Sequence, residues 1–418
     1  MSSFPANEAP SFDALGDIVE QRLSGCTDAK ATKTRESRLS NFLDFIKRND
    51  LTASYLTTNP FEVDKIVSRY IVYILSGFGC TTKFIEANTV KEYLKEINKH
   101  YIANGFSPPW INIADTKTAR LVRDKDKFEK EAERRSPLTD AVIDAIRMAA
   151  KNPTVSITDL QSIMWDVVGL GRYTGNRIQE IGMDAPNKIK YYSTPDGLVM
   201  RAFSVDNILF RDSHGMPIST ESALASPESV VQAGTCYDIQ KNRRNGQVLW
   251  YHKDILNPDY CPVMRALSLV RRAVQLGQLP SDPLCVYIEN DKRVYLTDKV
   301  VTEYYRTVTK RVHPTITEEM LSLISTHSIR VTACILLAEA GKPMYFIKLR
   351  LRWLSNCFEI YLRNTDRVAM QHLYAITPGT TAQATVTKVP LVRENIDSDI
   401  VKEFGNVTLG DYELDDED

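Results

Sequence analysis

The sequence predicts a mostly α-helical protein that carries a small antiparallel β-sheet or hairpin and folds as two domains. Apolar residues recur at helical spacing from residue 36 onward, first within 39–46 and then within 66–75. Between 186 and 260 short runs of β-branched and aromatic residues alternate with turn signals such as Asn245-Gly246. Residues 113–135 are rich in charge and poor in apolar side chains, so they predict a break between the domains.

The domain bounds follow from these changes in composition. Residues 1–33 are rich in Ser, Ala and Pro without periodicity, which predicts a flexible leader. Ser136-Pro137 marks the entry to a new helix, because proline is favoured at the first helical position. We therefore expect a leader at 1–33, a helical domain at 34–112, a charged linker or extended helix at 113–135, a second domain at 136–390 and an acidic tail at 391–418.

A row of lysines marks one helix of the first domain. Val90, Leu94 and Ile97 form part of an apolar stripe, and a second face of the same helix carries Lys91, Lys95 and Lys99. Such a row is either a solubilising surface or a contact for the phosphates of a nucleic acid.

Composition excludes several classes of protein. The chain has 418 residues, 43% hydrophobic and 25% charged, which is ordinary for a water-soluble protein with two or three cores. No apolar run reaches the roughly 18 residues that a membrane-spanning helix needs, and the first residues do not form a signal peptide. The seven cysteines have neither C-x-x-C pairs nor a repeating spacing, so the sequence indicates no disulfide framework and no zinc site. A reducing intracellular compartment is the simplest interpretation.

The net charge of −1 is unevenly distributed along the chain. Residues 394–418 contain ten acids and one base, a net charge of −9, and the remainder carries +8. Clustered cations in that remainder are compatible with a nucleic-acid partner. The acidic tail is typical of a solvated, disordered segment, and it could also lie over a basic groove and compete with DNA.

Four residues near the C-terminus form a set suited to phosphodiester chemistry. His327 and Arg330 stand one helical turn apart, and Trp353 and Tyr361 follow within the stretch Arg-Trp-Leu-Ser-Asn-Cys-Phe-Glu-Ile-Tyr. Phosphoryl transfer through a tyrosine needs cations for the non-bridging oxygens, a proton-transfer group and a positioned phenol. Tyr361 also shares a helical stripe with Phe358, which by itself is typical of core packing.

An upstream segment adds two further candidates. Arg177 follows a turn signal in Thr-Gly-Asn-Arg-Ile-Gln-Glu, and Glu180 lies one turn later. The start of a helix favours a phosphate because its backbone N–H groups are free. The alternative is a simple ion pair between the two side chains at i, i+3.

Together these segments resemble the tyrosine recombinases. In that family an arginine in a Thr-Gly-x-Arg-x-x-Glu setting precedes a His-x-x-Arg pair, then Trp or His, then the nucleophilic tyrosine, and this chain keeps that order. The eight residues from Trp353 to Tyr361 and the ending Tyr-Leu-Arg are similar to recombinases of Crypton-type and DIRS-type mobile elements. The resemblance implies a helical core-binding domain at 34–112 and a tyrosine-recombinase catalytic domain at 136–390.

The family's catalytic lysine lies on a β-hairpin between the first arginine and the His-x-x-Arg pair. Residues 237–241 and 247–252 are predicted to form such a hairpin, and Lys241 fits that place best. Arg243 and Lys253 remain alternatives, and Lys241 could also be an ordinary exposed lysine of a turn.

The resemblance implies the following chemistry. Tyr361 would attack DNA to form a 3′-phosphotyrosyl link, with no metal and no nucleotide cofactor. Arg177 and Arg330 would hold the phosphate oxygens, His327 and Lys241 would transfer protons, Trp353 would contact the phosphate and Glu180 would orient its neighbours. The partner is double-stranded DNA, bound by a homo-tetramer, in the nucleus if the source is eukaryotic. Cationic residues that we expect to contact DNA are Lys91, Lys95, Lys99, Arg243, Arg244, Lys348, Arg350 and Arg352.

The chain departs from the family pattern in places, and three functions remain open. Leu351 stands where a glycine commonly precedes the Arg-Trp pair, Val331 follows the His-x-x-Arg arginine where a small residue is frequent, and the hairpin region is expanded. The first function is a site-specific recombinase that integrates or excises a mobile element. The others are an enzyme like the type IB topoisomerases, and a catalytically silent protein that binds DNA or acts as a helical interaction partner.

Overall fold

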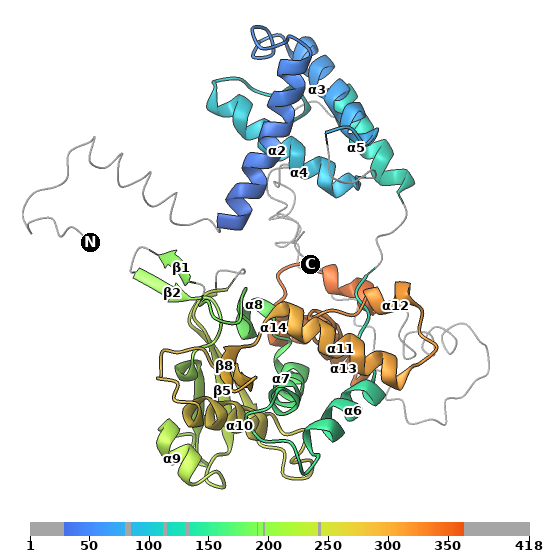
Figure 1. Ribbon diagram of the computed structural model, residues 1–418. Helices are drawn as coiled ribbons and strands as arrows, with labels where there is room; N and C mark the ends of the chain where they lie inside the picture. Colours follow the sequence, from blue (N-terminus) through green and yellow to red (C-terminus); the bar gives the residue numbers. More distant parts are fainter. Residues whose placement is uncertain are drawn as a thin grey trace, which may run out of the picture. The chain divides into compact units, whose positions relative to one another are not determined.

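The computed structural model describes residues 29–79, 85–111, 115–129, 134–189, 191–194, 197–240 and 244–362. The chain divides into two compact units between residues 132 and 133 (Figure 1). Both units are mostly helical, and the strands form small antiparallel sheets in the second, so the predicted fold class is confirmed. None of the helices in these ranges combines the length and the hydropathy that crossing a membrane requires.

The first unit is a helical bundle around an aromatic core. It consists of α2 (Ala29–Arg48), α3 (Pro60–Leu75), α4 (Ala87–Ala103), the short 3₁₀ helix η1 (Pro109–Ile111) and α5 (Lys117–Phe128). The side chains of Phe42, Tyr70 and Tyr101 are fully buried between these helices. Residues 29–33 already belong to α2, whereas we expected them in the leader, and residues 1–28 lie outside the described residues.

Helix α5 occupies the middle of the segment that we expected to be a linker. Its first N–H groups are held by a carboxylate of α3, because Lys117 and Thr118 both donate to Asp64 at 2.9 Å. Ala119, Leu121 and Val122 of the segment pack against the core of the bundle. This part of 113–135 is therefore a folded helix of the first unit, as the alternative of an extended helix allowed.

The helices of the second unit surround α7 (Leu160–Thr174). Helices α6 (Asp140–Ala150), α10 (Pro262–Gln275) and α13 (Ser328–Glu339) all pack against it (Figure 1). The contact with α13 is close at Gly171, where a Cβ atom would lie 2.9 Å from Ile329. The remaining helices are α8 (Ile178–Ile181), η2 (Val205–Asn207), α9 (Thr220–Ala225), α11 (Asp298–Val312), α12 (Glu318–Ser322), α14 (Met344–Leu351) and η3 (Cys357–Tyr361).

The strands of the second unit form one four-stranded sheet and two separate hairpins. The sheet has the order β4-β3-β5-β6 with every pair antiparallel. Its strands are β3 (Ile208–Arg211), β4 (Pro217–Ile218), β5 (Gln232–Tyr237) and β6 (Gln247–His252), and the hairpins are β1 (Tyr191–Thr194) with β2 (Gly197–Met200) and β7 (Val286–Glu289) with β8 (Lys292–Tyr295).

The predicted hairpin at 237–252 is confirmed in position but not in both strand bounds. β6 spans 247–252 as predicted, but β5 ends at Tyr237, the residue at which we expected the first strand to begin. Strand pairing stops there because the chain turns back at Gln240, whose backbone N–H donates a hydrogen bond to Asn245 Oδ1 at 2.8 Å. Residues 238–240 are thus part of the connection and not of the ladder.

The C-terminal part of the described chain has a core of its own. Helix α14, the loop after it and η3 fold onto α13 through buried side chains. These are Ala333, Cys334, Ile347, Leu351, Trp353, Phe358 and Leu362. Residues 363–418, which include the expected acidic tail, lie outside the described residues.

Gly175 ends α7 in a conformation that few other residues adopt. Its φ of +54° is left-handed, and a Cβ atom there would lie 2.9 Å from Leu351 Cδ2. We expect Gly175→Ala to lower the free energy of unfolding by about 2 to 4 kcal/mol, because backbone strain and overpacking add. Urea denaturation measures this loss.

Gly215→Ala is the matched control. Gly215 is also left-handed, with φ +77°, but nothing lies within 4 Å of its Cβ position. That variant should lose only the backbone term of about 1 kcal/mol. Equal losses in the two variants would contradict a steric contact between Gly175 and Leu351.

Candidate active site

Arg177 and Glu180 are positioned by the turn at the end of α7. After Gly175 the chain reverses, and Arg177 becomes the N-cap residue of the short helix α8. The carboxylate of Glu180 accepts a hydrogen bond from the backbone N–H of Arg177 at 2.9 Å, which fixes the helix start. The side-chain contact between Arg177 Nη1 and Glu180 Oε1 is longer, at 3.4 Å. The sequence prediction of a turn followed by a helix start is confirmed at this point.

His327 and Tyr361 lie next to each other although 34 residues separate them. His327 is the N-cap residue of α13, and Tyr361 is the last residue of η3. The Tyr361 hydroxyl is 3.4 Å from His327 Nε2, and both side chains are partly buried. The apolar stripe left open that the phenol is sealed in the core. Its hydroxyl instead faces an imidazole.

Arg330 and Trp353 complete the surroundings of that pair. The Arg330 guanidinium lies 4.1 Å from the centre of the Trp353 ring, and its Nη1 donates to the carbonyl oxygen of Gly175. The Trp353 ring meets His327 edge to face, with ring centres 6.3 Å apart. The indole N–H of Trp353 is buried without a hydrogen-bond partner among the described residues.

The environment keeps the His327 imidazole neutral. Burial and the nearby positive charges of Arg330, Arg177 and Arg135 lower the pKa of His327 to about 3. At neutral pH the ring therefore has a nitrogen that can accept a proton, and the Tyr361 hydroxyl lies 3.4 Å from Nε2 of that ring.

Glu180 is the negative centre of the site. Burial alone would raise its pKa, but the charge and hydrogen bonds of Arg352, with the charges of Arg177 and Arg330, lower the pKa to about 2. We call Arg177, Arg330 and Arg352 the arginine cluster. With one ionised carboxylate among three guanidiniums, the group carries a net charge of +2.

Arg352 corrects one of the sequence predictions. We expected it at the surface in contact with DNA, but its side chain is only 2% exposed. Its two terminal nitrogens donate to the two oxygens of Glu180 at 2.6 and 2.9 Å, and its guanidinium lies 3.7 Å from the centre of the Tyr237 ring. A fork of donors already bound to a carboxylate is not available to a phosphate. No spacing in the sequence indicates this pair, since 172 residues separate its members.

The structure leaves the candidate lysine open. Lys241 and Arg243 lie outside the described residues, between Gln240 and Arg244 of the β5–β6 connection. The alternative, Lys253, is held by backbone carbonyls, since its Nζ donates to Pro227 at 2.9 Å. That contact uses the Lys253 amine within the fold.

The other cationic candidates have varied surroundings. Lys91, Lys95 and Lys99 each lie beside a carboxylate, at distances from 2.9 to 4.0 Å, as on a solvated helix face. Lys348 donates to the side chain of Asn356 at 3.1 Å, and Arg350 donates to the Trp250 carbonyl at 3.0 Å. Arg244 is exposed beside the hairpin turn.

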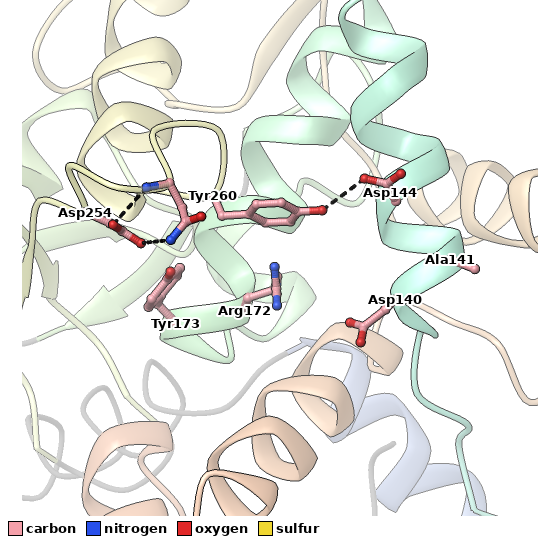
Figure 2. Close-up of a pocket in the computed structure, with 8 residues that line it drawn as sticks. Asp140, Ala141, Asp144, Arg172, Tyr173, Asp254 and Tyr260 are labelled. Atoms are coloured by element: carbon pink, nitrogen blue, oxygen red, sulfur yellow. Dashed lines mark hydrogen bonds between the residues drawn. The ribbon is translucent and has the colours of Figure 1, made fainter.

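A hollow of about 570 Å³ in the second unit contains none of the predicted residues (Figure 2). It is lined by Asp140, Ala141, Asp144, Arg172, Tyr173, Asp254, Asn257 and Tyr260. Two of its three acids are engaged within the fold: Asp144 accepts from Tyr260 at 3.1 Å, and Asp254 accepts from the backbone of Leu256 and Asn257 at 3.0 Å. The residues around Tyr361 are therefore the stronger candidate for chemistry.

The low pKa of His327 predicts an acid-sensitive fold. The unfolded chain binds a proton at His327 near pH 6.5, but the folded chain does so only near pH 3. Stability should therefore fall as the pH drops below 6.5, by up to about 1.4 kcal/mol per pH unit. The pKa of Glu180 is lowered from 4.5 to about 2, so its contribution to the free energy of unfolding is lost only as the pH falls from about 4.5 to about 2.

Between about pH 6.5 and 5 the effect of His327 is thus separate from that of Glu180 and adds to that of His100, whose pKa burial also lowers. We expect His327→Gln to flatten the pH dependence of the free energy of unfolding in this window, as measured by urea titrations. His214→Gln, which changes an exposed histidine, serves as the control and should keep the wild-type slope. A wild-type slope in His327→Gln contradicts the neutral buried imidazole.

Comparison with known proteins finds likeness in structure only. No family model and no curated protein sequence matches the chain. Among solved structures, the chain is similar to the integrase of transposon Tn1549 in complex with circular intermediate DNA, at 11% identity and a TM-score of 0.42 over 86% of this chain and 97% of that one. It is also similar to a lambda integrase dimer bound to a core site, at 14% identity and a TM-score of 0.41 over 85% of this chain and 96% of that one. A further similar structure is XerA recombinase, at 14% identity and a TM-score of 0.32 over 86% of this chain and 96% of that one. The solved structures that resemble this chain thus include DNA integrases and a recombinase.

Proposed function

We propose that this protein is a site-specific DNA recombinase that cleaves and rejoins strands through a 3′-phosphotyrosyl intermediate. The observation that carries the proposal is the contact of 3.4 Å between the Tyr361 hydroxyl and His327 Nε2, beside the guanidinium of Arg330. A nucleophile with a base within reach and with cations for the developing charge is the arrangement that phosphoryl transfer requires. Arg177 joins the same group through Glu180.

In the first step the Tyr361 oxygen attacks the phosphorus atom of a DNA phosphodiester. The bond from phosphorus to the 5′-oxygen breaks, a bond from phosphorus to the tyrosine forms, and His327 accepts the phenolic proton. Arg177 and Arg330 stabilise the two non-bridging oxygens while charge shifts in the transition state. The buried Trp353 N–H is a donor that suits a further phosphate oxygen.

The leaving 5′-oxygen needs a proton, and Lys241 is the proposed donor. The phosphotyrosyl ester preserves the energy of the broken bond, so attack by another 5′-hydroxyl can reseal DNA without a nucleotide cofactor. We propose that strand exchange takes place in a homo-tetramer on double-stranded DNA, for the integration or excision of a mobile element of the Crypton-like or DIRS-like kind.

Contacts with the DNA backbone would come from both units. In this proposal Lys91, Lys95 and Lys99 of α4, Arg243 and Arg244 of the hairpin and Lys348 and Arg350 of α14 neutralise phosphates. The ion pairs of the three lysines with acids would then be exchanged for phosphate contacts on binding. Arg352 does not belong to this set, because it is buried.

The proposal predicts a covalent complex that depends on Tyr361. A nicked DNA substrate that loses its short 5′-hydroxyl fragment cannot be resealed, so the protein should remain attached and migrate more slowly on a denaturing gel. A duplex library with random sequence provides the substrate. Tyr361→Phe should yield no adduct, because it removes the attacking oxygen and keeps the ring.

Tyr345→Phe is the matched control. Tyr345 is a neighbouring tyrosine on α14 whose side chain is 63% exposed, and its variant should form the adduct as the wild type does. Absence of an adduct in the wild type, together with retained DNA binding, would instead support a silent DNA-binding protein.

Recombination and topoisomerase activity are separated by the fate of the cleaved strand. We expect joining between two different duplexes, because a recombinase passes the 5′-hydroxyl of one duplex to the phosphotyrosine of another. The measurement is the yield of joined product from two differently labelled duplexes, with the wild type and with the Tyr361→Phe variant. Relaxation of supercoiled plasmid without any joining between duplexes would favour the topoisomerase-like alternative.

A further inference from the structure

Arg352 adopts a backbone conformation that is unfavourable for its residue type. It follows α14 with φ +60° and ψ +40°, in the left-handed region. The other non-glycine residues with positive φ in the described chain are Asp50, Asn290 and Asp291, whose short polar side chains tolerate this region. An arginine there costs about 1 kcal/mol relative to glycine, so the side chain must contribute something that offsets the strain.

The Arg352 side chain is fixed from three sides. Besides its two-pronged contact with Glu180, its Nη1 lies 3.3 Å from Gln240 Oε1, and the flat face of the guanidinium lies against Tyr237. Gln240 and Tyr237 belong to the β5–β6 hairpin and its connection. A planar guanidinium fits this combination of fork and stacking, whereas a lysine would not.

The same carboxylate serves both Arg352 and Arg177. Glu180 Oε1 is 2.6 Å from Arg352 Nη1 but 3.4 Å from Arg177 Nη1. Glu180 Oε2 accepts from Arg352 Nη2 and from the backbone N–H of Arg177, both at 2.9 Å. The negative charge of Glu180 is thus directed mainly to Arg352, and Arg177 is held chiefly through its backbone.

Removal of Arg352 would change this balance. A buried carboxylate without a close cation is unfavourable, and the guanidinium of Arg177, whose Nη1 lies 3.4 Å from Glu180 Oε1, is in position to replace Arg352. A close ion pair between them would neutralise Arg177 and turn its donors away from a DNA phosphate.

We propose that Arg352 is a positioning residue for DNA cleavage: it binds Glu180 and thereby leaves the charge and donors of Arg177 to the scissile phosphate. This inference rests on the proposed function and deepens it. Arg352 does not touch the DNA; it acts through Glu180 on Arg177. Arg352 directly precedes Trp353, so its contacts also fix the chain at the start of the segment that carries Tyr361.

The test compares two substrates in single-turnover cleavage by the full chain. One nicked duplex has a normal phosphate at the cleavage site, and the other has a methylphosphonate, in which an uncharged methyl group replaces one non-bridging oxygen. Arg352→Met should slow cleavage of the phosphate about 100-fold and that of the methylphosphonate much less, because a neutral centre depends less on Arg177.

A second substitution should relieve the defect. Glu180→Gln keeps an oxygen that accepts the Arg177 backbone N–H but has no charge with which to neutralise the guanidinium. We expect Arg352→Met with Glu180→Gln to recover to within about tenfold of the wild-type rate on the phosphate. This double variant also avoids an unpaired buried charge, so it should fold where the single variant does not.

The matched control is a buried arginine elsewhere in the second unit. Arg272 is fully buried and forms an ion pair with Asp166, so Arg272→Met also removes the cation of a buried pair. It should lower stability but leave the ratio of the two cleavage rates at the wild-type value. Arg352→Lys, which keeps the charge without the fork, should give an intermediate ratio if Arg352→Met is unfolded.

The outcomes separate the two proposals. If the wild type forms no adduct with Tyr361, the proposed function is wrong and the role of Arg352 falls with it. If the wild type cleaves but every foldable Arg352 variant keeps the wild-type rate ratio, or Glu180→Gln brings no recovery, only the role of Arg352 is overturned. A selective loss on the phosphate that Glu180→Gln relieves supports it.

Discussion

The left-handed turn at Gly175 is the constraint on which the candidate site depends. Its carbonyl oxygen accepts a hydrogen bond from the buried Arg330 of α13, and its bare Cα lies against Leu351 at the end of α14. The turn also begins the short segment that leads to Arg177. One residue thus joins three parts of the chain that are far apart in sequence, and a side chain at this position would separate them.

Electrostatics at this turn follow from a shortage of negative charge. Glu180 faces three guanidiniums and remains ionised, and the same positive surroundings help to keep His327 neutral. A neutral imidazole can accept a proton from a phenol, whereas an imidazolium cannot. The cations that suit a phosphate therefore also set the protonation state of the neighbouring base.

The sequence was informative where local signals or a motif specified the structure. Asn245-Gly246 identified the hairpin turn, and the turn signal before Arg177 identified the start of α8. It was incomplete where a long-range partner decided the outcome: the sequence left a linker or an extended helix open for 113–135, and contacts with Asp64 and the bundle core hold α5 there. Arg352 shows the same limit, because only the fold reveals that a carboxylate 172 residues away occupies its donors.

The surplus positive charge of the arginine cluster has a consequence for stability. Two of its guanidiniums are almost fully buried, Arg330 at 1% and Arg352 at 2% exposure, and like charges in such a site repel each other at a cost in folding free energy. A bound DNA phosphate would supply a second negative charge and offset part of that repulsion. Under the proposed function, binding of DNA would therefore also stabilise the folded chain, because a ligand that binds only the folded chain stabilises it. Stability is thus reduced in the free protein by the same charges that make the site suitable for phosphate.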